Sequence, residues 1–552
     1  MTDSSAPLSR DESTRYLCAA AHLDPDFANA AIREFLVEST RAVAPSPGVN
    51  SGAVLREAIA ARSRRRTRDS LLALLLAVFA FCSPAALIVW VVVAMAACAG
   101  RMRLWQNQKV RGLSGPMKLA LALGVLAVAG YVVSSTALLA QLDTTTTSSS
   151  RVTPVETDDN TGTVLAILAV VLFAMMAAIL VADRLAVWAL LTRSFRRGRF
   201  ESNRAVGDRW PHEWLVRTFG HEYFAFDLPS ANEERPDRRP EAVVYRGYHP
   251  FVGAGLPYQP WSVAFPLHPR DADAEPETFT LRELYDALER DLTGLGSSPS
   301  MSPSNRLRHL TAFERVVIPA DDLLVRVGDP ATTSILPDHL RRPKRHLSDE
   351  VVERISESPL EWMRYFRCFQ LETWDRALVI SAYLHLGSDE RNLYLEWTPC
   401  VLLPVRREYR EFDELPTNSW QPVARAFGRL LRLPVTIFGR FAHAVASIRP
   451  IPEEPGLLLP EKYGAMTSLR ELAAGPEVED YFQRTDLERY IKVLDTRLIR
   501  SVGEFLEGKG LASAEFMARV EQVTSNNVHI EGSVTGNVFI GNHNKTGDVA
   551  KS

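Results

Sequence analysis

Two neighbouring pairs of His and Glu are the residues in this sequence most suited to metal chemistry. His212-Glu213 and His221-Glu222 stand on either side of Trp214–Gly220. A zinc-binding helix of the metalloprotease type needs two His residues four positions apart with a Glu between them, and this spacing does not supply that pattern. We therefore interpret the pairs as loop residues and predict neither a metal ion nor a cofactor.

A glycine-rich segment is the second candidate. The strand-like stretch Ala242–Arg246 leads directly into Gly247–Gly255, which reads Gly-Tyr-His-Pro-Phe-Val-Gly-Ala-Gly. Backbone amides of such a loop can cradle a phosphate, but the known phosphate-binding patterns continue into a helix with a Lys or into a Rossmann unit. Neither follows here, so a turn packed by Tyr248 and Phe251 is preferred and phosphate binding is the alternative.

The sequence contains no nucleophile elbow, Walker loop or paired-carboxylate motif. An enzyme is therefore disfavoured, and no catalytic or cofactor-binding residue is predicted.

The elements that would position these candidates belong to a predicted α+β domain over residues 200–480. Strands are expected at Trp261–Leu267 and Phe313–Ile318. The clearest strand signal is the alternation of Ala377–Leu386, and a short turn leads from it into Leu393–Val405, which predicts a β-hairpin. Helices are expected over residues 280–292, 349–356 and 486–506, the last within a C-terminal helical region at 481–524.

Composition excludes several classes of function. The chain has 552 residues and a net charge of -3, so nucleic-acid binding has no electrostatic support. Its five Cys residues lack the spacing of metal ligands, which fits a reducing compartment and argues against a zinc site or a disulfide framework. Residues 1–68 carry helical periodicity, so an N-terminal helical region in the cytoplasm is expected.

Three apolar runs dominate residues 69–192 and predict a membrane block. Leu71–Ala99, Leu119–Leu142 and Val164–Ala182 contain no Lys, Arg, Asp, Glu or His. A charge-free run of about 20 residues crosses the hydrocarbon core as a helix. The first run is too long for one crossing and is interrupted at Ser83-Pro84, so a hairpin, re-entrant or with two short crossings, is expected there.

The flanking charges predict how this block is oriented. Arg and Lys clusters stand on both sides of the first run and after the third, whereas the linker Asp143–Gly162 is acidic. Basic flanks stay in the cytoplasm, so we expect a multi-pass protein of the plasma membrane with both termini cytoplasmic. Since no run carries an ionisable group, an anchor in the lipid bilayer is favoured over a pore or transporter.

The C-terminal residues 525–546 contain a ten-residue repeat. Asn527-Val-His-Ile aligns with Asn537-Val-Phe-Ile, and Gly and Asn residues separate the two segments. Short β segments without Pro and with few charges can stack as cross-β, and two such units are too few to bury their own apolar face. Stacking on other copies of the chain would therefore make a homo-oligomer. The residues predicted to mediate assembly are Val528, Ile530, Val538, Ile540, Gly541, Asn542 and Asn544.

Two resemblances add to these predictions. Val538-Phe-Ile-Gly541 with the Asn residues that follow it resembles the core of the RIP homotypic interaction motif and of bacterial amyloid signalling motifs, although Phe539 replaces the usual Gln and Glu531 follows Ile530. This resemblance implies self-assembly or a protein partner with a similar β-repeat motif. Tyr248–Gly255, with the pattern Tyr-x-Pro-Phe-Val-Gly-x-Gly, is similar to a segment of actinobacterial multi-pass membrane proteins and implies no activity.

The predicted fold is thus a set of α-helical membrane segments plus a cytoplasmic α+β domain, with a short C-terminal β-repeat tail. The first functional hypothesis is a membrane-anchored, cytoplasm-facing interaction or signalling protein that self-assembles through that tail. The alternatives are a membrane-tethered enzyme with its site in residues 200–480, and a clustering-gated channel or membrane-perturbing effector.

Overall fold

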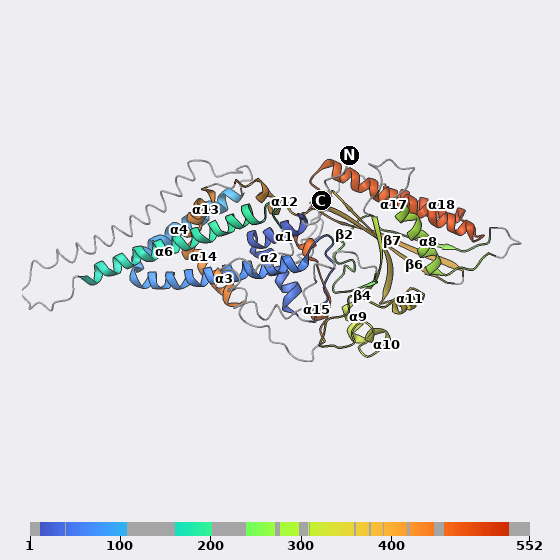
Figure 1. Ribbon diagram of the computed structural model, residues 1–552, viewed down its shortest axis with the longest axis horizontal. Helices are drawn as coiled ribbons and strands as arrows, with labels where there is room; N and C mark the ends of the chain where they lie inside the picture. The colour runs from blue at the N-terminus through green and yellow to red at the C-terminus, as the bar shows by residue number, and fades with distance from the viewer. Residues whose placement is uncertain are drawn as a thin grey trace, which may run out of the picture.

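A helical part and a mixed β-sheet domain lie side by side along the long axis of the molecule (Figure 1). The computed structural model describes residues 12–106, 160–200 and 239–528. Segments inside these ranges that lie outside the description are residue 39 and residues 271–275, 297–306, 308–309, 358–359, 375–376, 390, 417–419 and 447–457.

The sheet has seven strands in the order β1-β4-β5-β6-β7-β2, and β3 pairs with β7 beside β2. Only β1 and β4 are parallel among these neighbours. The predicted hairpin is confirmed, because β6 and β7 pair from Val379–Leu402 to Ser388–Leu393. The strands are β1 Glu241–Tyr245, β2 Leu256–Pro257, β3 Trp261–Pro266, β4 Leu310–Pro319, β5 Arg364–Thr373, β6 Leu378–Ser388 and β7 Asn392–Leu402.

Helices α8, α17 and α18 contribute to the main core, which also includes residues of three shorter helices. Thr280 caps α8 (Leu281–Gly294) by accepting the amide of Glu283, as its sequence pattern predicts. The predicted apolar stripe of α17 (Tyr481–Gly508) is buried along its length, from Leu487 to Leu506. Together with α18 (Ala514–Val528), α17 therefore shares one core with the strands.

The N-terminal helices form a bundle in the middle of the molecule. Its core combines α1 (Glu12–Leu23), α2 (Pro25–Ile32), the π-helical turn η1 (Arg33–Val37) and the first half of α3 (Ser51–Cys82). Later segments complete it, namely η3 Leu190–Ser194, α12 Arg407–Arg410, η7 Glu411–Glu414 and α16 Leu469–Ala473. The remaining short helices are α9 Ala320–Val325, α10 Pro330–Thr333, α11 Asp349–Glu357 and α15 Pro460–Tyr463.

A helical arm extends from this bundle to the far end of the molecule (Figure 1). The second half of α3, together with α4, α6, α13 and α14, shares an apolar core that includes Phe79, Trp90 and Met176. The break predicted at Ser83-Pro84 is confirmed, because α3 ends at Cys82 and α4 begins at Pro84. The bounds are α4 Pro84–Gln106, α6 Asn160–Ala189, α13 Gln421–Leu431 and α14 Leu433–Ala446.

The prediction of several membrane-spanning helices is wrong for the described part of the chain. There, Val164–Ser194 is the single helix long and apolar enough to cross a membrane, and one such helix is weak evidence by itself. The run Leu119–Leu142 lies outside the described residues. The structure therefore corrects both the multi-span helical fold class and the location in the plasma membrane with both termini cytoplasmic.

The physical reason is the length of the two halves of the first run. Its part in α3 covers residues 71–82, which at ~1.5 Å per residue is only about 18 Å. The charge-free part of α4, residues 84–100, spans about 25 Å at the same rise and is also shorter than the roughly 30 Å of helix that a crossing needs. The two halves pack against α6, α13 and α14 in the arm core.

Candidate functional site

The glycine-rich loop predicted after β1 cradles an anion that belongs to the chain itself. Gly253 N and Gly255 N donate to Oε1 of Glu471 at 2.8 and 2.9 Å, and Ser468 N donates to Oε2 at 2.7 Å. Burial raises the pKa of the Glu471 carboxyl, and the backbone donors partly offset that effect. Because a side chain already occupies these amides, the phosphate-cradle alternative fails for this loop.

Close approach of the backbone explains the two glycines. Gly253 (φ +93°) would place a Cβ 2.2 Å from the carbonyl O of Pro45, and Gly255 (φ +86°) would place one 2.1 Å from the carbonyl O of Val401. Phe251 packs against Phe366 and Tyr383 as a turn residue should. Tyr248 is 92% exposed, so the prediction that it packs the turn is wrong. The loop is a clamp that joins the N-terminal segment, β7 and α16.

The structure describes almost none of the other candidate residues that the sequence analysis identified. Both His-Glu pairs lie outside the described residues. Helix α18 continues through Val528, the first residue of the predicted assembly set, and the remaining six residues of that set lie beyond the description. Within the described residues no group of three or more His, Cys, Asp or Glu side chains is arranged to hold a metal ion.

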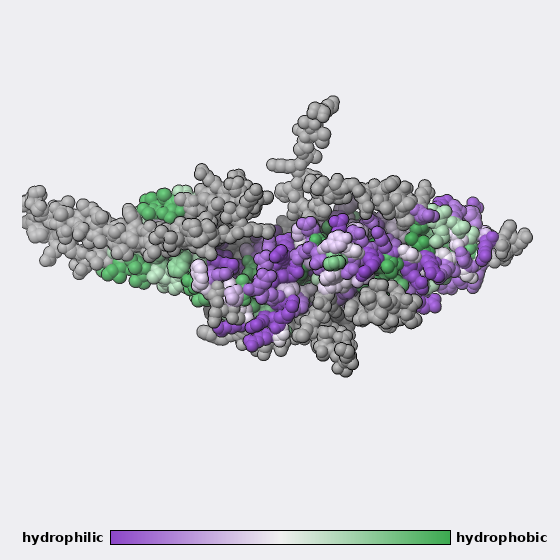
Figure 2. All heavy atoms as spheres, turned by 90° about the horizontal axis from the view of Figure 1, so that it is seen from above, coloured by the Kyte–Doolittle hydropathy of each residue, from purple (hydrophilic) through white to green (hydrophobic). Residues whose placement is uncertain are grey.

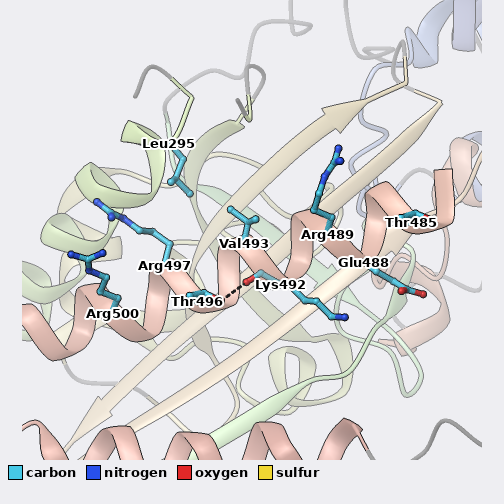
Figure 3. A pocket seen from close by; sticks show the side chains of 9 residues that line it. All are labelled: Leu295, Thr485, Glu488, Arg489, Lys492, Val493, Thr496, Arg497 and Arg500. Carbon is cyan, nitrogen blue, oxygen red and sulfur yellow. Dashed lines mark hydrogen bonds between the residues drawn. The ribbon is translucent and has the colours of Figure 1, made fainter. Parts of the chain in front are cut away.

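A shallow groove of about 530 Å³ lies between α17 and the C-terminal end of α8 (Figure 3). Its three arginines are paired with acidic neighbours: Arg497 with Asp291, Arg489 with Asp486 and Arg500 with Glu504. Figure 3 shows the basic side chains pointing in different directions along α17. The groove therefore presents no converging set of groups that could do chemistry.

The arm carries a surface of a different kind. Figure 2 shows apolar residues gathered at its end of the molecule, while the described surface toward the sheet domain is mostly hydrophilic. Phe81 is 86% exposed and Ile167 is 61% exposed, although both are large apolar residues. Further exposed apolar residues of the arm are Leu74, Val78, Ile88, Val92, Met95, Val164, Leu168, Val171, Met175 and Phe438. An apolar surface of this extent marks a contact with a protein or a membrane.

A buried group of charges, here called the neck cluster, lies where the arm meets the bundle. Arg68 donates from Nη1 to Asp183 at 2.8 Å and from Nε to Asp69 at 2.8 Å, and Arg64 Nε lies 3.1 Å from Asp183. The neck cluster comprises Arg64, Arg65, Arg68, Arg184 and Arg440 with Glu57, Asp69 and Asp183.

A neutral histidine connects the neck cluster to the bundle. Burial lowers the pKa of His22 to about 4. Its Nε2 lies 2.8 Å from Glu57 and its Nδ1 lies 3.1 Å from Nη1 of Arg64. The neutral tautomer that satisfies both contacts donates to the carboxylate and accepts from the guanidinium. The arginines of the neck cluster outnumber the carboxylates around them, with five arginines against Glu57, Asp69, Asp183 and, near Arg65, Asp24.

The predicted apolar runs Leu71–Ala99 and Val164–Ala182 supply most of the exposed apolar surface of the arm, whereas no feature of the sequence predicted the neck cluster as a unit. The arginines of α3 were expected as a flank of a membrane run, and their carboxylate Asp183 follows a different run. The spacing of apolar residues along the sequence predicts which side of each helix is apolar. It does not predict which polar residues of distant helices contact one another.

Comparison with known proteins places the chain by a family model. No curated protein and no solved structure matches this chain. The family model of the AbeC-like domain matches residues 260–541, from the start of β3 into the C-terminal tail. This range includes α13 and α14 of the arm, whereas α3, α4 and α6 precede it. Since the match covers just over half of the 552 residues, the chain belongs to the AbeC-like domain family.

Proposed function

We propose that this protein is an interaction protein that its helical arm anchors in a lipid bilayer and that self-assembles through its C-terminal tail. The observation that carries the anchoring is the exposed apolar surface of α3, α4, α6 and α14 at one end of the molecule. In water this surface would cost about 25 cal/mol for each Å² left unburied. Lipid chains remove that cost without a protein partner.

Helix α6 supplies the length for an anchor. Val164–Ser194, which joins α6 to η3, has 31 residues, and its charge-free part Val164–Ala182 comes close to the ~20 residues that a crossing needs. One side of α6 packs on the arm core through Ala169, Leu172 and Met176. Its other side leaves Ile167 and Val171 exposed, which is the side that would face lipid.

Flotation of the full chain with neutral phosphatidylcholine vesicles tests the anchor. An Asp at the bilayer centre costs about 2.5–3.5 kcal/mol, so each of Phe81→Asp and Val171→Asp, at exposed positions nearer the middle of the apolar runs, is expected to lower partitioning about 100-fold. The matched control is Val325→Asp with Leu340→Asp, at positions 83% and 68% exposed in the sheet domain. Failure of the unaltered protein to float, or equal loss in the control, would contradict the proposal.

Self-assembly is supported by the repeat of Asn-Val-x-Ile at residues 527–540. Helix α18 leads from the sheet domain toward this repeat and is fixed at its base by Phe516 and Val520, which are buried in the main core. Two repeat units cannot bury their own face, so copies from several chains would stack. Deletion of residues 529–552 should reduce the oligomer measured by light scattering to a smaller species, and an unchanged size would contradict assembly through the tail.

A further inference from the structure

The neck cluster has more positive charge than its own carboxylates compensate. Its arginines come from three helices: Arg64, Arg65 and Arg68 from α3, Arg184 from α6 and Arg440 from α14. In the described structure, Nη1 of Arg440 and Nε of Arg184 are buried and have no hydrogen-bond partner. Burial, together with the neighbouring charges of Arg64 and Arg68, lowers the pKa of Arg65 to about 9. Buried cations are normally balanced by nearby negative charges, and the carboxylates of the neck cluster balance only part of its positive charge.

The position of the neck cluster suggests the source of that counter-charge. Exposed apolar residues of the arm begin directly beside it, with Leu71 on α3. On the opposite side, His22 and Glu57 belong to the polar bundle. If the arm lies in a bilayer, this boundary between apolar and polar surface falls at the level of the lipid headgroups.

We propose that the neck cluster binds the phosphate group of an anionic lipid headgroup. Guanidinium groups match phosphate oxygens with N–H donors, and Arg184 and Arg440 each carry one guanidinium nitrogen without a hydrogen-bond partner. The adjacent apolar surface would hold the acyl chains of the same lipid. This inference rests on the proposed anchoring of the arm and adds a ligand class to it.

The test measures the melting temperature of the full chain in neutral detergent micelles. Phosphatidylglycerol, phosphatidylcholine and inorganic phosphate are titrated separately, since a ligand that binds only the folded state raises the melting temperature in a saturable way. Phosphatidylglycerol is expected to raise it by several degrees and phosphatidylcholine to have no saturable effect. An equal rise with inorganic phosphate would overturn the lipid assignment, and no rise with either would overturn the site.

Two pairs of arginine variants distinguish binding at the neck cluster from general electrostatic attraction between the protein and the anionic lipid. Arg184→Gln with Arg440→Gln should move the midpoint of the phosphatidylglycerol titration at least tenfold to higher concentration. Arg193→Gln with Arg199→Gln removes the same charge from exposed positions just after α6 and should leave the midpoint within twofold. An equal shift in both pairs would contradict a defined site. Arg440→Lys, which keeps the charge but loses the fork, gives a milder test if the double variant does not fold.

The two proposals fail in different ways. If the arm is not a membrane anchor, the unaltered protein will not float with phosphatidylcholine vesicles. If only the headgroup site is absent, flotation with neutral vesicles persists and the preference for phosphatidylglycerol disappears.

Discussion

Arg68 and Asp183 form a buried ion pair of 2.8 Å although 115 positions separate them in the sequence. The pair joins α3 to α6 where the bundle ends and the arm begins, and Asp69 holds the Arg68 guanidinium from its other side. Both partners are almost fully buried, at 9% and 5% side-chain exposure. The contribution of this ion pair to stability therefore depends on both side chains being present.

Removing one partner leaves an uncompensated buried charge. We expect Asp183→Ala to lower the free energy of unfolding by about 3–5 kcal/mol. The exposed pair Arg484–Glu488 on α17 provides the control, since Glu488→Ala should cost less than about 0.5 kcal/mol. Denaturant unfolding in detergent measures both, and equal effects would contradict the importance of burial.

Asp495 gives a pH-dependent prediction. It accepts a 2.5 Å hydrogen bond from Nε1 of Trp397, and burial raises its pKa to about 6. A carboxyl whose pKa is higher in the folded than in the unfolded state binds more protons when folded, so stability falls as pH rises from about 4 to 6. A shift of two pKa units corresponds to about 3 kcal/mol.

Asp495→Asn removes this cost while keeping an acceptor for the indole N–H. The variant should therefore be more stable than the unaltered protein at pH 7.5, by about 1–2 kcal/mol, and lose that advantage at pH 4.5. Chemical denaturation at the two pH values measures the difference. A gain that is independent of pH would contradict the assignment, and Asp486→Asn, at a partly exposed position nearer the start of the same helix, should change little at either pH.

The glycine clamp predicts a sharp difference between two glycines of similar φ. Gly255→Ala should destabilise the protein by about 2–4 kcal/mol, because its Cβ would meet the backbone of Val401. Gly247 has φ +85° but nothing within 4 Å of its Cβ position, so Gly247→Ala should cost only ~1–2 kcal/mol of backbone strain. Thermal unfolding compares the two, and similar losses would mean that φ alone matters there.

The tail prediction follows from the alternation of strand residues. In stacked β units Ile540 points into a dry interface, where an Asp would have to be desolvated, so Ile540→Asp should abolish assembly. Phe539 lies on the opposite face and should tolerate Ser better. A peptide of residues 525–546 tests this by thioflavin fluorescence and by fibre diffraction near ~4.7 Å. A peptide that stays monomeric at high concentration would leave the tail without a role in assembly.

Local patterns in the sequence predicted much of the local structure. The alternation of residues 377–386 gave the hairpin of β6 and β7, the apolar stripe of residues 487–506 gave α17, and Ser83-Pro84 gave the break after α3. Each of these depends on residues close together in the chain, where periodicity and proline geometry act directly.

Contacts between distant segments were not predictable in the same way. Glu471 fills the glycine loop from 216 positions away, and nothing local marks it as the occupant. The membrane prediction treated residues 71–99 as one hairpin of the bilayer, whereas half of that run is the end of a helix that begins at Ser51 in the polar bundle. Hydrophobicity along the chain measures affinity for an apolar environment and does not distinguish lipid from a neighbouring helix.

The arm also constrains the order of events during synthesis. Trp90 of α4 donates its indole N–H to the carbonyl of Leu431 at 3.1 Å, and α13 packs on α6 although it begins about 230 residues after α6 ends. At ~5–20 residues per second, a ribosome needs roughly 10–50 seconds to make that intervening chain. For this interval α3, α4 and α6 exist without the helices that complete their core. A nascent chain of this protein therefore needs a bilayer or a chaperone to shield its arm before the sheet domain has emerged.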